Sequence, residues 1–537
     1  MEINGMKRSQ ARRSAISGWT SRKRYIVASI LATNSLTAAM LTFLGSKVYA
    51  TPANTLLGLP TYAPAVYWAS VAMALGALLV SMKGSKLAFL SAGLLLFSTW
   101  EGLPSLLLSS AYRLDAHYIA ALATATLTGG PIDIGNVGTS YLQFPGFILN
   151  GAVVSCLLGL GTLSIAQWAP ALWSGLFFLG FSVLVFRVIG ENTSARLASI
   201  LGSFGCAWLQ FHFAPQAAAL FLFPLLLALL LVKTFSSQLA AIVIGTWMSI
   251  SHPPSILIVF SLLAAQWILR SLPISWIRKM TSDHSSLTGA NEPRQGTLLS
   301  LWGVLAIWIA WILFIAGPTF INAIALVGRY LTSEGAISAS ARTPDLYVLT
   351  SSVRLLALGF VGAVWCFSFL ALALRYSTSK GHLLTAAWLV GEIPFALVVL
   401  PVGLLDRAYM FFFLGGALAM GDLRERLKSP RLAGLIVAGF VVASIAAGAT
   451  AYRDSNQYIV PPRWAGSEST QFRFLDSYLG PACQPGAIAY VDTFTTLWTT
   501  ARYGNASMVD RMAATLSNGS QVYSDGTTNG YIVSCAA

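Results

Sequence analysis

The chain has 537 residues, of which 56% are hydrophobic and only 10% are charged, and its formal net charge is +14. A soluble globular protein usually carries about 25% charged residues, so this composition excludes an ordinary soluble protein. The charged residues are replaced by repeated long apolar runs, which indicate a polytopic membrane protein. The positive charge does not indicate nucleic-acid binding, because the basic residues lie beside apolar runs, where they set membrane orientation.

The chain begins with a strongly basic segment, 1–24, which we expect to stay in the cytoplasm. The first apolar run follows at about 25–44. The letters "VYA" before Thr51 resemble a signal-peptidase site, but the run is long for a signal peptide. We therefore expect an uncleaved anchor helix.

The apolar runs that follow predict further helices and an all-α polytopic membrane protein with about 13 transmembrane helices over residues 25–451. An odd number of crossings places the C-terminus outside a cell membrane and the N-terminus inside. The loops assigned to the cytoplasm then hold 22 of the 33 Lys and Arg residues, which favours this orientation. The expected helices after the first are 64–82, 87–107, 169–187, 197–212, 216–233, 238–252, 255–270, 298–317, 352–374, 382–401, 405–421 and 432–450.

One apolar segment, 146–165, is long enough to cross but would turn every later basic loop outward if it did. We therefore expect it to be a re-entrant or interfacial helix on the outer face. Irregular backbone at membrane depth is tolerated where protein covers it. The segment belongs to a first large outer loop, 108–168.

The last part of the chain, 452–537, is polar and rich in Thr, Ser, Asn and Gly. We expect a small extracytoplasmic α+β region there. Cys483 and Cys535 flank most of it and are expected to form a disulfide if the region faces an oxidising compartment. The other three cysteines lie in apolar segments, where packing is the simplest role, and no metal-binding Cys or His spacing occurs.

Polar residues of unusual kinds gather on the expected outer face. Glu101 lies near the outer end of the third helix, and an ionisable residue inside a membrane costs about 2.5–3.5 kcal/mol, which suggests function. The other candidates lie in the first outer loop, in the turns "FHFAPQ" and "SHPPS", and in "DRAY": Asp115, His117, Asp133, Tyr141, His212, Gln216, His252 and Arg407.

Each candidate also has a structural interpretation. Asp115 suits a helix N-cap as well as a catalytic carboxylate, and Asp133 follows a Gly-Gly-Pro turn. His117 could face water or lipid headgroups, whereas His212, Gln216 and His252 could satisfy loose backbone groups, and each of them could instead contact a substrate. Arg407 could form a simple ion pair, or its planar guanidinium could hold a phosphate. No P-loop, GxSxG or HExxH motif occurs, so nucleotide-driven transport and soluble-hydrolase chemistry have no support.

The early carboxylate followed by "HYIAALATATLTGG", "GPIDI" and "YLQFPGF" resembles the first outer loop of GT-C superfamily glycosyltransferases. The start of "FHFAPQAAALFLF" looks like the "FSPQ" helix start of uncharacterised prokaryotic members, and "SHPPSILIVF" and "DRAYMFFF" are similar to later outer turns. The resemblance covers about residues 87–451. It implies a polytopic membrane enzyme that uses a polyprenyl-phosphate sugar.

The resemblance implies roles for these residues. Asp115 would be the base that deprotonates a glycan, lipid or protein acceptor, which attacks the anomeric carbon with inversion. Asp133 would be a second carboxylate, for the acceptor or a metal, and Arg407 with His212 or His252 would neutralise the leaving phosphate. Some relatives use a divalent metal such as Mg²⁺ or Mn²⁺, which Asp115 and Asp133 would bind here. The loop lacks a DxD motif, so no cofactor is firmly expected.

Three alternative functions remain open. A transporter or lipid-linked-glycan flippase would use similar helices, although the polar groups gather at one face and no inverted repeat is evident. A polysaccharide ligase or polymerase tends to carry its large outer loop late in the chain, whereas here the loop is early. The third alternative is an assembly protein that works through its C-terminal region.

Overall fold

The computed structural model describes a helical body and three short strands. The described residues are 21–45, 59–108, 111, 114–127, 143–207, 211–232, 234–271, 295–321, 324–325, 387–388, 390–391, 411, 413–421, 488–490, 520–524 and 529–532. The predicted helices 352–374 and 432–450 lie outside these residues, and those at 382–401 and 405–421 are described only in part.

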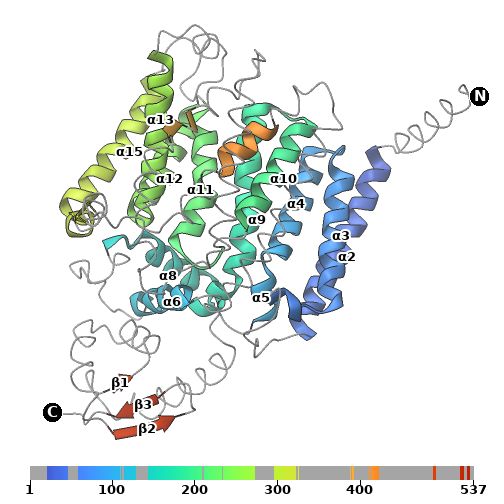
Figure 1. Ribbon diagram of the computed structural model, residues 1–537, viewed down its shortest axis with the longest axis horizontal. Helices are drawn as coiled ribbons and strands as arrows, with labels where there is room; N and C mark the ends of the chain where they lie inside the picture. The colour runs from blue at the N-terminus through green and yellow to red at the C-terminus, as the bar shows by residue number, and fades with distance from the viewer. Residues whose placement is uncertain are drawn as a thin grey trace, which may run out of the picture.

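Helices dominate the described chain, as the apolar runs predict. Figure 1 shows most of them side by side along one direction, with α6 and α8 lying across one end of this bundle. The helices are α2 (Ser21–Gly45), the 3-10 turn η1 (Leu59–Tyr62), α3 (Ala65–Ser81), α4 (Lys86–Trp100), α5 (Leu103–Leu107), α6 (Leu114–Leu127), α8 (Gly146–Leu158), α9 (Thr162–Ile189), α10 (Thr193–Ala207), α11 (Pro215–Leu230), α12 (Phe235–Ser251), α13 (Pro253–Ser271) and α15 (Gln295–Phe314).

Two of the described helices are long and apolar enough to cross a membrane, namely Lys23–Gly45 within α2 and Thr162–Ile189, which is α9. The other apolar helices of the described part have 10–17 residues by the same measure. An N-terminal signal sequence or a buried core helix can also have this length and composition. The predominance of helices among the described residues confirms a mostly helical fold. The count of thirteen crossings stays a prediction.

Several predicted helices have different bounds in the structure, such as the one expected at 197–212, which is α10 (Thr193–Ala207), and two differences concern the site. The helix expected at 87–107 is divided into α4 and α5, because Gly102 and Pro104 interrupt it. Pro104 has no N–H to donate to a carbonyl of the preceding turn, and a Cβ on Gly102 would lie 2.0 Å from the Ser98 carbonyl oxygen. The helix expected at 169–187 begins earlier, at Thr162, and is the longest one described.

The segment 146–165 does not form one long helix. Its helix, α8, has 13 residues and is therefore about 20 Å long, shorter than the roughly 30 Å hydrocarbon core of a bilayer. Gly159 ends it with a φ of 62°, a left-handed conformation that glycine adopts without strain, and α9 begins at Thr162. The helices α4, α10 and α11 are only slightly longer, so length does not separate α8 from the helices expected to cross, and its non-crossing placement stays a prediction.

The core of the bundle lies between α4, α9, α10 and α11. Its aromatic side chains are close: the rings of Phe97 and Phe178 stack at 5.1 Å between centroids, and Phe97 meets Phe204 edge-on at 4.8 Å. Glycines allow the helices to approach, since a Cβ on Gly93 would lie 2.1 Å from the Phe178 ring. Small residues at helix contacts are typical of membrane bundles.

The first helix packs on its neighbour through polar atoms as well as apolar ones. The hydroxyl of Ser35 on α2 donates to the Ser70 carbonyl at 2.8 Å, and the hydroxyl of Ser70 on α3 donates to the Ser35 carbonyl at 2.7 Å. Both side chains are fully buried. Reciprocal bonds of this kind hold helices together where water does not compete. They make α2 an integral part of the bundle.

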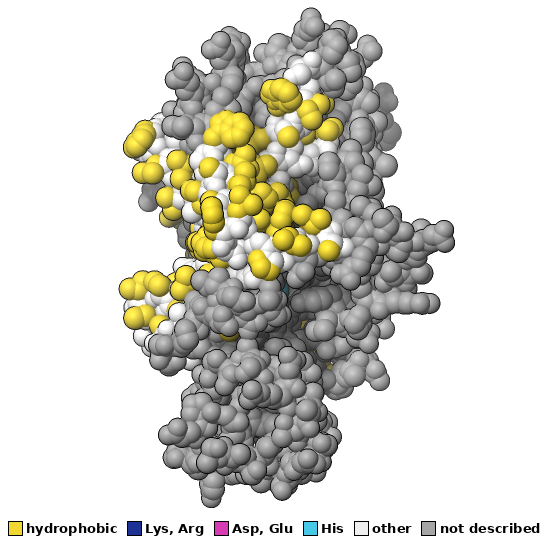
Figure 2. Space-filling model, turned by 90° about the vertical axis from the view of Figure 1, so that its left-hand side faces the viewer, with side chains coloured by type: hydrophobic (Ala, Val, Ile, Leu, Met, Phe, Trp, Pro, Cys, Tyr) yellow, Lys and Arg dark blue, Asp and Glu magenta, His cyan; other side chains and the backbone are white. Residues whose placement is uncertain are grey.

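Large apolar side chains remain exposed on the outside of the bundle. On α15, Trp302 is 65% exposed and Phe314 is 85% exposed, and on α13 Trp267 is 70% exposed. Figure 2 shows apolar side chains spread over this face, with no Lys, Arg, Asp or Glu visible among the described residues. An apolar face of this extent calls for a partner or a membrane to cover it.

The described Lys and Arg residues all lie at one end of the bundle. They occur at the start of α2, in the α3–α4 turn, around the α9–α10 turn and at the end of α13. Helix directions alternate along the chain, which brings these positions to the end opposite α6 and α8 (Figure 1). Among the described residues, the basic side chains are therefore concentrated at this end.

The C-terminal region contains three short strands, β1 (Ile488–Tyr490), β2 (Ser520–Ser524) and β3 (Asn529–Ile532). They form an antiparallel sheet in the order β1-β3-β2. Ala489 pairs with Tyr531 and Ser520 pairs with Ile532, with a register shift between Gln521 and Tyr523. Strands were expected in this region. Cys483 and Cys535 lie outside the described residues.

Candidate functional site

The candidate site lies at the end of the bundle that α6 and α8 cross. Here a compact apolar cluster, which we call the α6–α8 cluster, joins these two helices to α9 and to the turn before α11. Its small residues let the helices lie close together. Its members are Ala111, Ala116, Ile119, Ala120, Ala123, Phe147, Ile148, Ala152, Ala166, Ala169, Phe213, Ala214 and Ala218, with Trp173 and Trp247 packed against them.

The helix α6 carries Asp115 and His117, whose side chains lie outside the described atoms. Ala116, Ile119, Ala120 and Ala123 are fully buried, and their spacing of three and four residues fixes one face of α6 against the cluster. The described part of α6 begins at Leu114, which places Asp115 in its first turn. Residues 112–113 lie outside the described residues, so the N-cap interpretation of Asp115 stays a prediction. A carboxylate there is still favoured in its charged form by the helix dipole.

The turn "FHFAPQ" is buried in this cluster. Pro215 begins α11, since proline suits a first helical position, and Ala214 donates its N–H to the His212 carbonyl at 2.8 Å. Phe213 packs on Phe147 of α8, with 4.8 Å between ring centroids. His212 is only 1% exposed. The turn therefore holds a buried imidazole beside the helix that carries Asp115.

Gln216 follows in the first turn of α11 and is 5% exposed. Its Nε2 has no hydrogen-bond partner among the described residues. Buried amide groups in folded proteins are nearly always paired, so an unpartnered one calls for an explanation such as a ligand or a water molecule.

The "SHPPS" turn follows α12 and lies against the start of α8. His252 ends α12, donates its N–H to the Met248 carbonyl at 2.8 Å, and places Nδ1 2.7 Å from the Ser255 hydroxyl. The buried Ser251 hydroxyl has no partner among the described residues, and a Cβ on Gly146 of α8 would lie 2.3 Å from it. The start of α8 thus fits directly against the end of α12.

Gln143 is a buried residue that the sequence analysis did not single out. Its backbone carbonyl accepts from the Trp311 indole N–H at 3.0 Å, and its side-chain oxygen accepts from the Thr319 N–H at 3.3 Å and from the Thr319 hydroxyl. These bonds attach the chain before α8 to the region around the end of α15. Its place in "YLQFPGF", two residues after Tyr141, could have drawn attention to it.

Glu101 is buried at the break between α4 and α5, at 4% exposure. Beside this break the Tyr67 hydroxyl donates toward the Trp100 carbonyl at 3.1 Å, so it partly satisfies the open end of α4. The Ser105 hydroxyl of α5 is fully buried and lacks a partner among the described residues. This end of the bundle is therefore rich in buried polar groups.

The structure brings the elements that carry five of the sequence candidates to one end of the bundle. α6 with Asp115 and His117 shares the α6–α8 cluster with the turn of His212 and Gln216. His252 joins them through the contact of α8 with the end of α12. Asp133, Tyr141 and Arg407 lie outside the described residues.

No metal centre is found at this end among the described residues. No group of three or more His, Cys, Asp or Glu residues within it could hold a metal ion. The side chains of Asp115 and Asp133 are not among the described atoms, so the metal expectation is untested.

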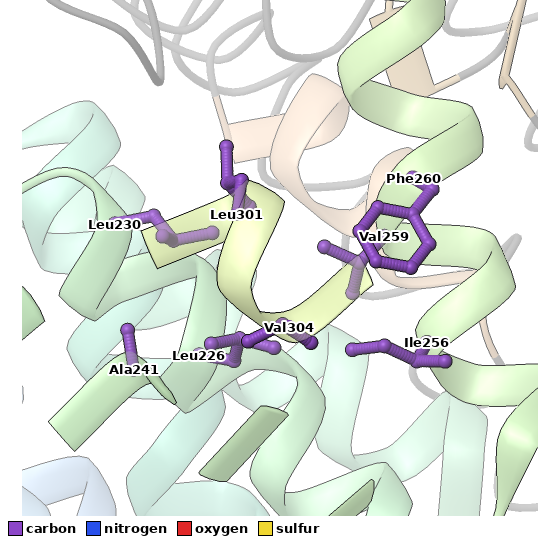
Figure 3. Close-up of a pocket in the computed structure, with 8 residues that line it drawn as sticks. All are labelled: Leu226, Leu230, Ala241, Ile256, Val259, Phe260, Leu301 and Val304. Atoms are coloured by element: carbon purple, nitrogen blue, oxygen red, sulfur yellow. The ribbon is translucent and has the colours of Figure 1, made fainter. Parts of the chain in front are cut away.

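A small cavity lies elsewhere, between α11, α12, α13 and α15, and Figure 3 shows its lining. Its volume of about 10 Å³ barely admits a water molecule, and its walls are entirely apolar, so it is a packing gap. It is lined by Leu226, Leu230, Ala241, Ile256, Val259, Phe260, Leu301 and Val304.

Comparison with known proteins gives no family for this chain. No protein-family model matches it, and no curated protein matches it. The GT-C resemblance therefore rests on the short motifs in the sequence.

Proposed function

We propose that this chain is a membrane-embedded glycosyltransferase that moves a sugar from a polyprenyl-phosphate donor to an acceptor at the extracytoplasmic surface. The membrane part of the proposal is supported by the exposed apolar face and by the gathering of Lys and Arg at one end. Basic residues favour the cytoplasmic side, so the end with α6 and α8 faces outward.

The observation that supports the catalytic part is that α6 and the "FHFAPQ" turn belong to one buried apolar cluster, the α6–α8 cluster. A general base must be held within reach of the proton that it removes, and loops supported by a rigid scaffold commonly hold such groups. Here α6 positions Asp115, and the cluster fixes α6 relative to His212 and Gln216. The unpartnered Gln216 amide suits a hydroxyl group of a sugar.

The reaction follows from these roles. Asp115 takes the proton of an acceptor hydroxyl, and the acceptor oxygen forms a bond to the anomeric carbon from the face opposite the donor phosphate. The bond between that carbon and the phosphate oxygen breaks, and polyprenyl phosphate leaves with the electron pair. Arg407, with His212 or His252, stabilises the negative charge on the leaving phosphate.

The test is donor turnover by the purified full-length protein in detergent. A panel of polyprenyl-phosphate sugars is incubated with the protein and a crude envelope acceptor mixture, and released polyprenyl phosphate is measured. We expect Asp115→Asn to lower the rate by about 10²–10⁴-fold, the range for loss of a general base.

Glu191→Gln is the matched control, because it removes a carboxylate from the opposite end of the bundle. It should leave the rate within about twofold of wild type, since exposed ion pairs contribute little. Equal rates for Asp115→Asn and Glu191→Gln would contradict the role of Asp115. Movement of a lipid-linked sugar across liposomes, without release from any donor, would favour the transporter alternative.

A further inference from the structure

A second cavity lies at the Lys- and Arg-rich end of the bundle, between α2 and the turn that joins α3 to α4. Its volume is about 300 Å³, which reaches the lower end of the roughly 300–1,000 Å³ range of ligand pockets. Arg24, Tyr25 and Ala28 of α2 form one wall. Ser81, Gly84, Ser85 and Ala88 form the other.

The α3–α4 turn is held rigidly from two sides. Arg196 of α10 donates to the Ser81 carbonyl at 2.8 Å and to the Gly84 carbonyl at 3.0 Å. From the other side, Arg24 donates one N–H to the Lys83 carbonyl at 3.3 Å. Two guanidinium groups therefore fix the turn that forms the second wall, so the cavity does not depend on a loose loop.

Arg24 and Ser85 can supply hydrogen-bond donors to the cavity. Arg24 has five N–H donors, and only the bond to Lys83 is found among the described residues. Ser85 caps α4 by accepting from the Ala88 N–H at 3.1 Å, and the α4 N-terminus adds the positive end of a helix dipole. These donors suit an anion with several oxygens, which a phosphate group provides.

The charged side chains around the cavity are mostly positive, like Arg24 in its wall. Lys23, Lys83 and Arg187 are exposed at this end, and Lys86 pairs with Glu191. Glu191 is the one acidic residue that the described part of the chain has at this end. A net negative headgroup is thus favoured over a zwitterionic one, whose cationic portion would meet the lysines.

The wall on α2 continues into apolar surface. Tyr25 is 62% exposed, Ile26 is 47% exposed and Ile30 is 54% exposed on the same helix. A ligand with a phosphate and long hydrocarbon chains would place the phosphate at the donors and its chains along α2. A free phosphate would leave this apolar surface uncovered.

We propose that the cavity between α2 and the α3–α4 turn binds the phosphate of an anionic membrane phospholipid on the cytoplasmic side. The site is separate from the end that carries Asp115, and it requires membrane embedding but not sugar transfer. Its failure and a failure of the glycosyltransferase assignment are therefore distinguishable.

The test is native mass spectrometry of the full-length protein, released from mixed micelles that contain equal amounts of phosphatidylglycerol and phosphatidylcholine. We expect one tightly retained phosphatidylglycerol on the wild-type protein. Arg24→Gln should weaken its retention by about tenfold, the loss expected for one charge-assisted hydrogen bond. The control Arg187→Gln removes an exposed positive charge from the same end, outside the cavity, and should retain the lipid.

A second variant, Ala88→Leu, fills the cavity and leaves every charge in place. It should release the lipid as Arg24→Gln does, and it decides the question if Arg24→Gln fails to fold. Equal retention by Arg24→Gln, Ala88→Leu and Arg187→Gln would overturn the proposal, as would equal retention of the two lipids by wild type. Displacement of the lipid by millimolar inorganic phosphate would overturn the lipid assignment and identify free phosphate as the ligand.

Discussion

The contact between α4 and α9 allows a quantitative prediction for Gly93→Ala. A Cβ at Gly93 would lie 2.1 Å from two atoms of the Phe178 ring and 2.8 Å from a third. Phe178 is fully buried and stacks on Phe97, so it has little room to move. The new methyl group must either separate the helices or turn the ring out of its stack.

The expected magnitude combines three contributions. Overpacking a core costs about 1–3 kcal/mol, and disturbing an aromatic pair costs about 0.5–1.5 kcal/mol. Replacing glycine by alanine within a helix returns about 1 kcal/mol. We therefore expect Gly93→Ala to destabilise the protein by about 0.5–3.5 kcal/mol.

The assay is the apparent melting temperature of the purified variants in one detergent. Gly303→Ala on α15 is the matched control, because a Cβ at Gly303 would meet nothing within 4 Å and should stabilise slightly. Both changes reduce the freedom of the unfolded chain equally, so their difference isolates the packing effect. A Gly93→Ala variant that melts as high as Gly303→Ala would refute the described contact between α4 and α9.

Two further predictions concern the opposite end of the bundle and the C-terminal region. Arg196→Met should destabilise the protein by about 2–4 kcal/mol, because it leaves the Ser81 and Gly84 carbonyls without their charged donor. Arg196→Lys should recover part of this loss in melting temperature, and a Met variant as stable as wild type would contradict the role of Arg196. Cys483 and Cys535 should form a disulfide in protein secreted into an oxidising compartment. Intact-mass mapping that finds both thiols free would remove that assignment.

The apolar runs of the sequence were sufficient to predict most described helices. Residues 64–82 and 238–252 correspond closely to α3 and α12, because these segments have clear breaks in their sequences. The division at Gly102 was missed, since the apolar pattern continues through the break into Leu106 and Leu107. Hydropathy detects burial well and detects a local interruption of the helix poorly.

The candidate site could be predicted only in part. A turn rich in His and Pro at a helix start, as in "FHFAPQ", is visible in the sequence. The burial of Gln143 and its bonds to Trp311 and Thr319 depend on partners more than 160 residues away, which no local pattern reveals. The cavity beside Arg24 likewise depends on the packing of α2 against the α3–α4 turn.

The account rests on the two ends of the bundle facing opposite sides of a membrane. The most direct measurement uses single cysteines in a background without the native cysteines, one from Leu127→Cys and one from Glu191→Cys. Leu127 ends α6 and is 41% exposed, and the Glu191 side chain is 54% exposed at the other end.

A membrane-impermeant maleimide is then added to sealed, right-side-out vesicles. The account predicts immediate labelling of Leu127→Cys and labelling of Glu191→Cys only after the membrane is opened. Labelling of both cysteines from the outside would contradict the account, because the helices between them would then not cross. Labelling of Glu191→Cys alone would place the Asp115 end in the cytoplasm and equally contradict it.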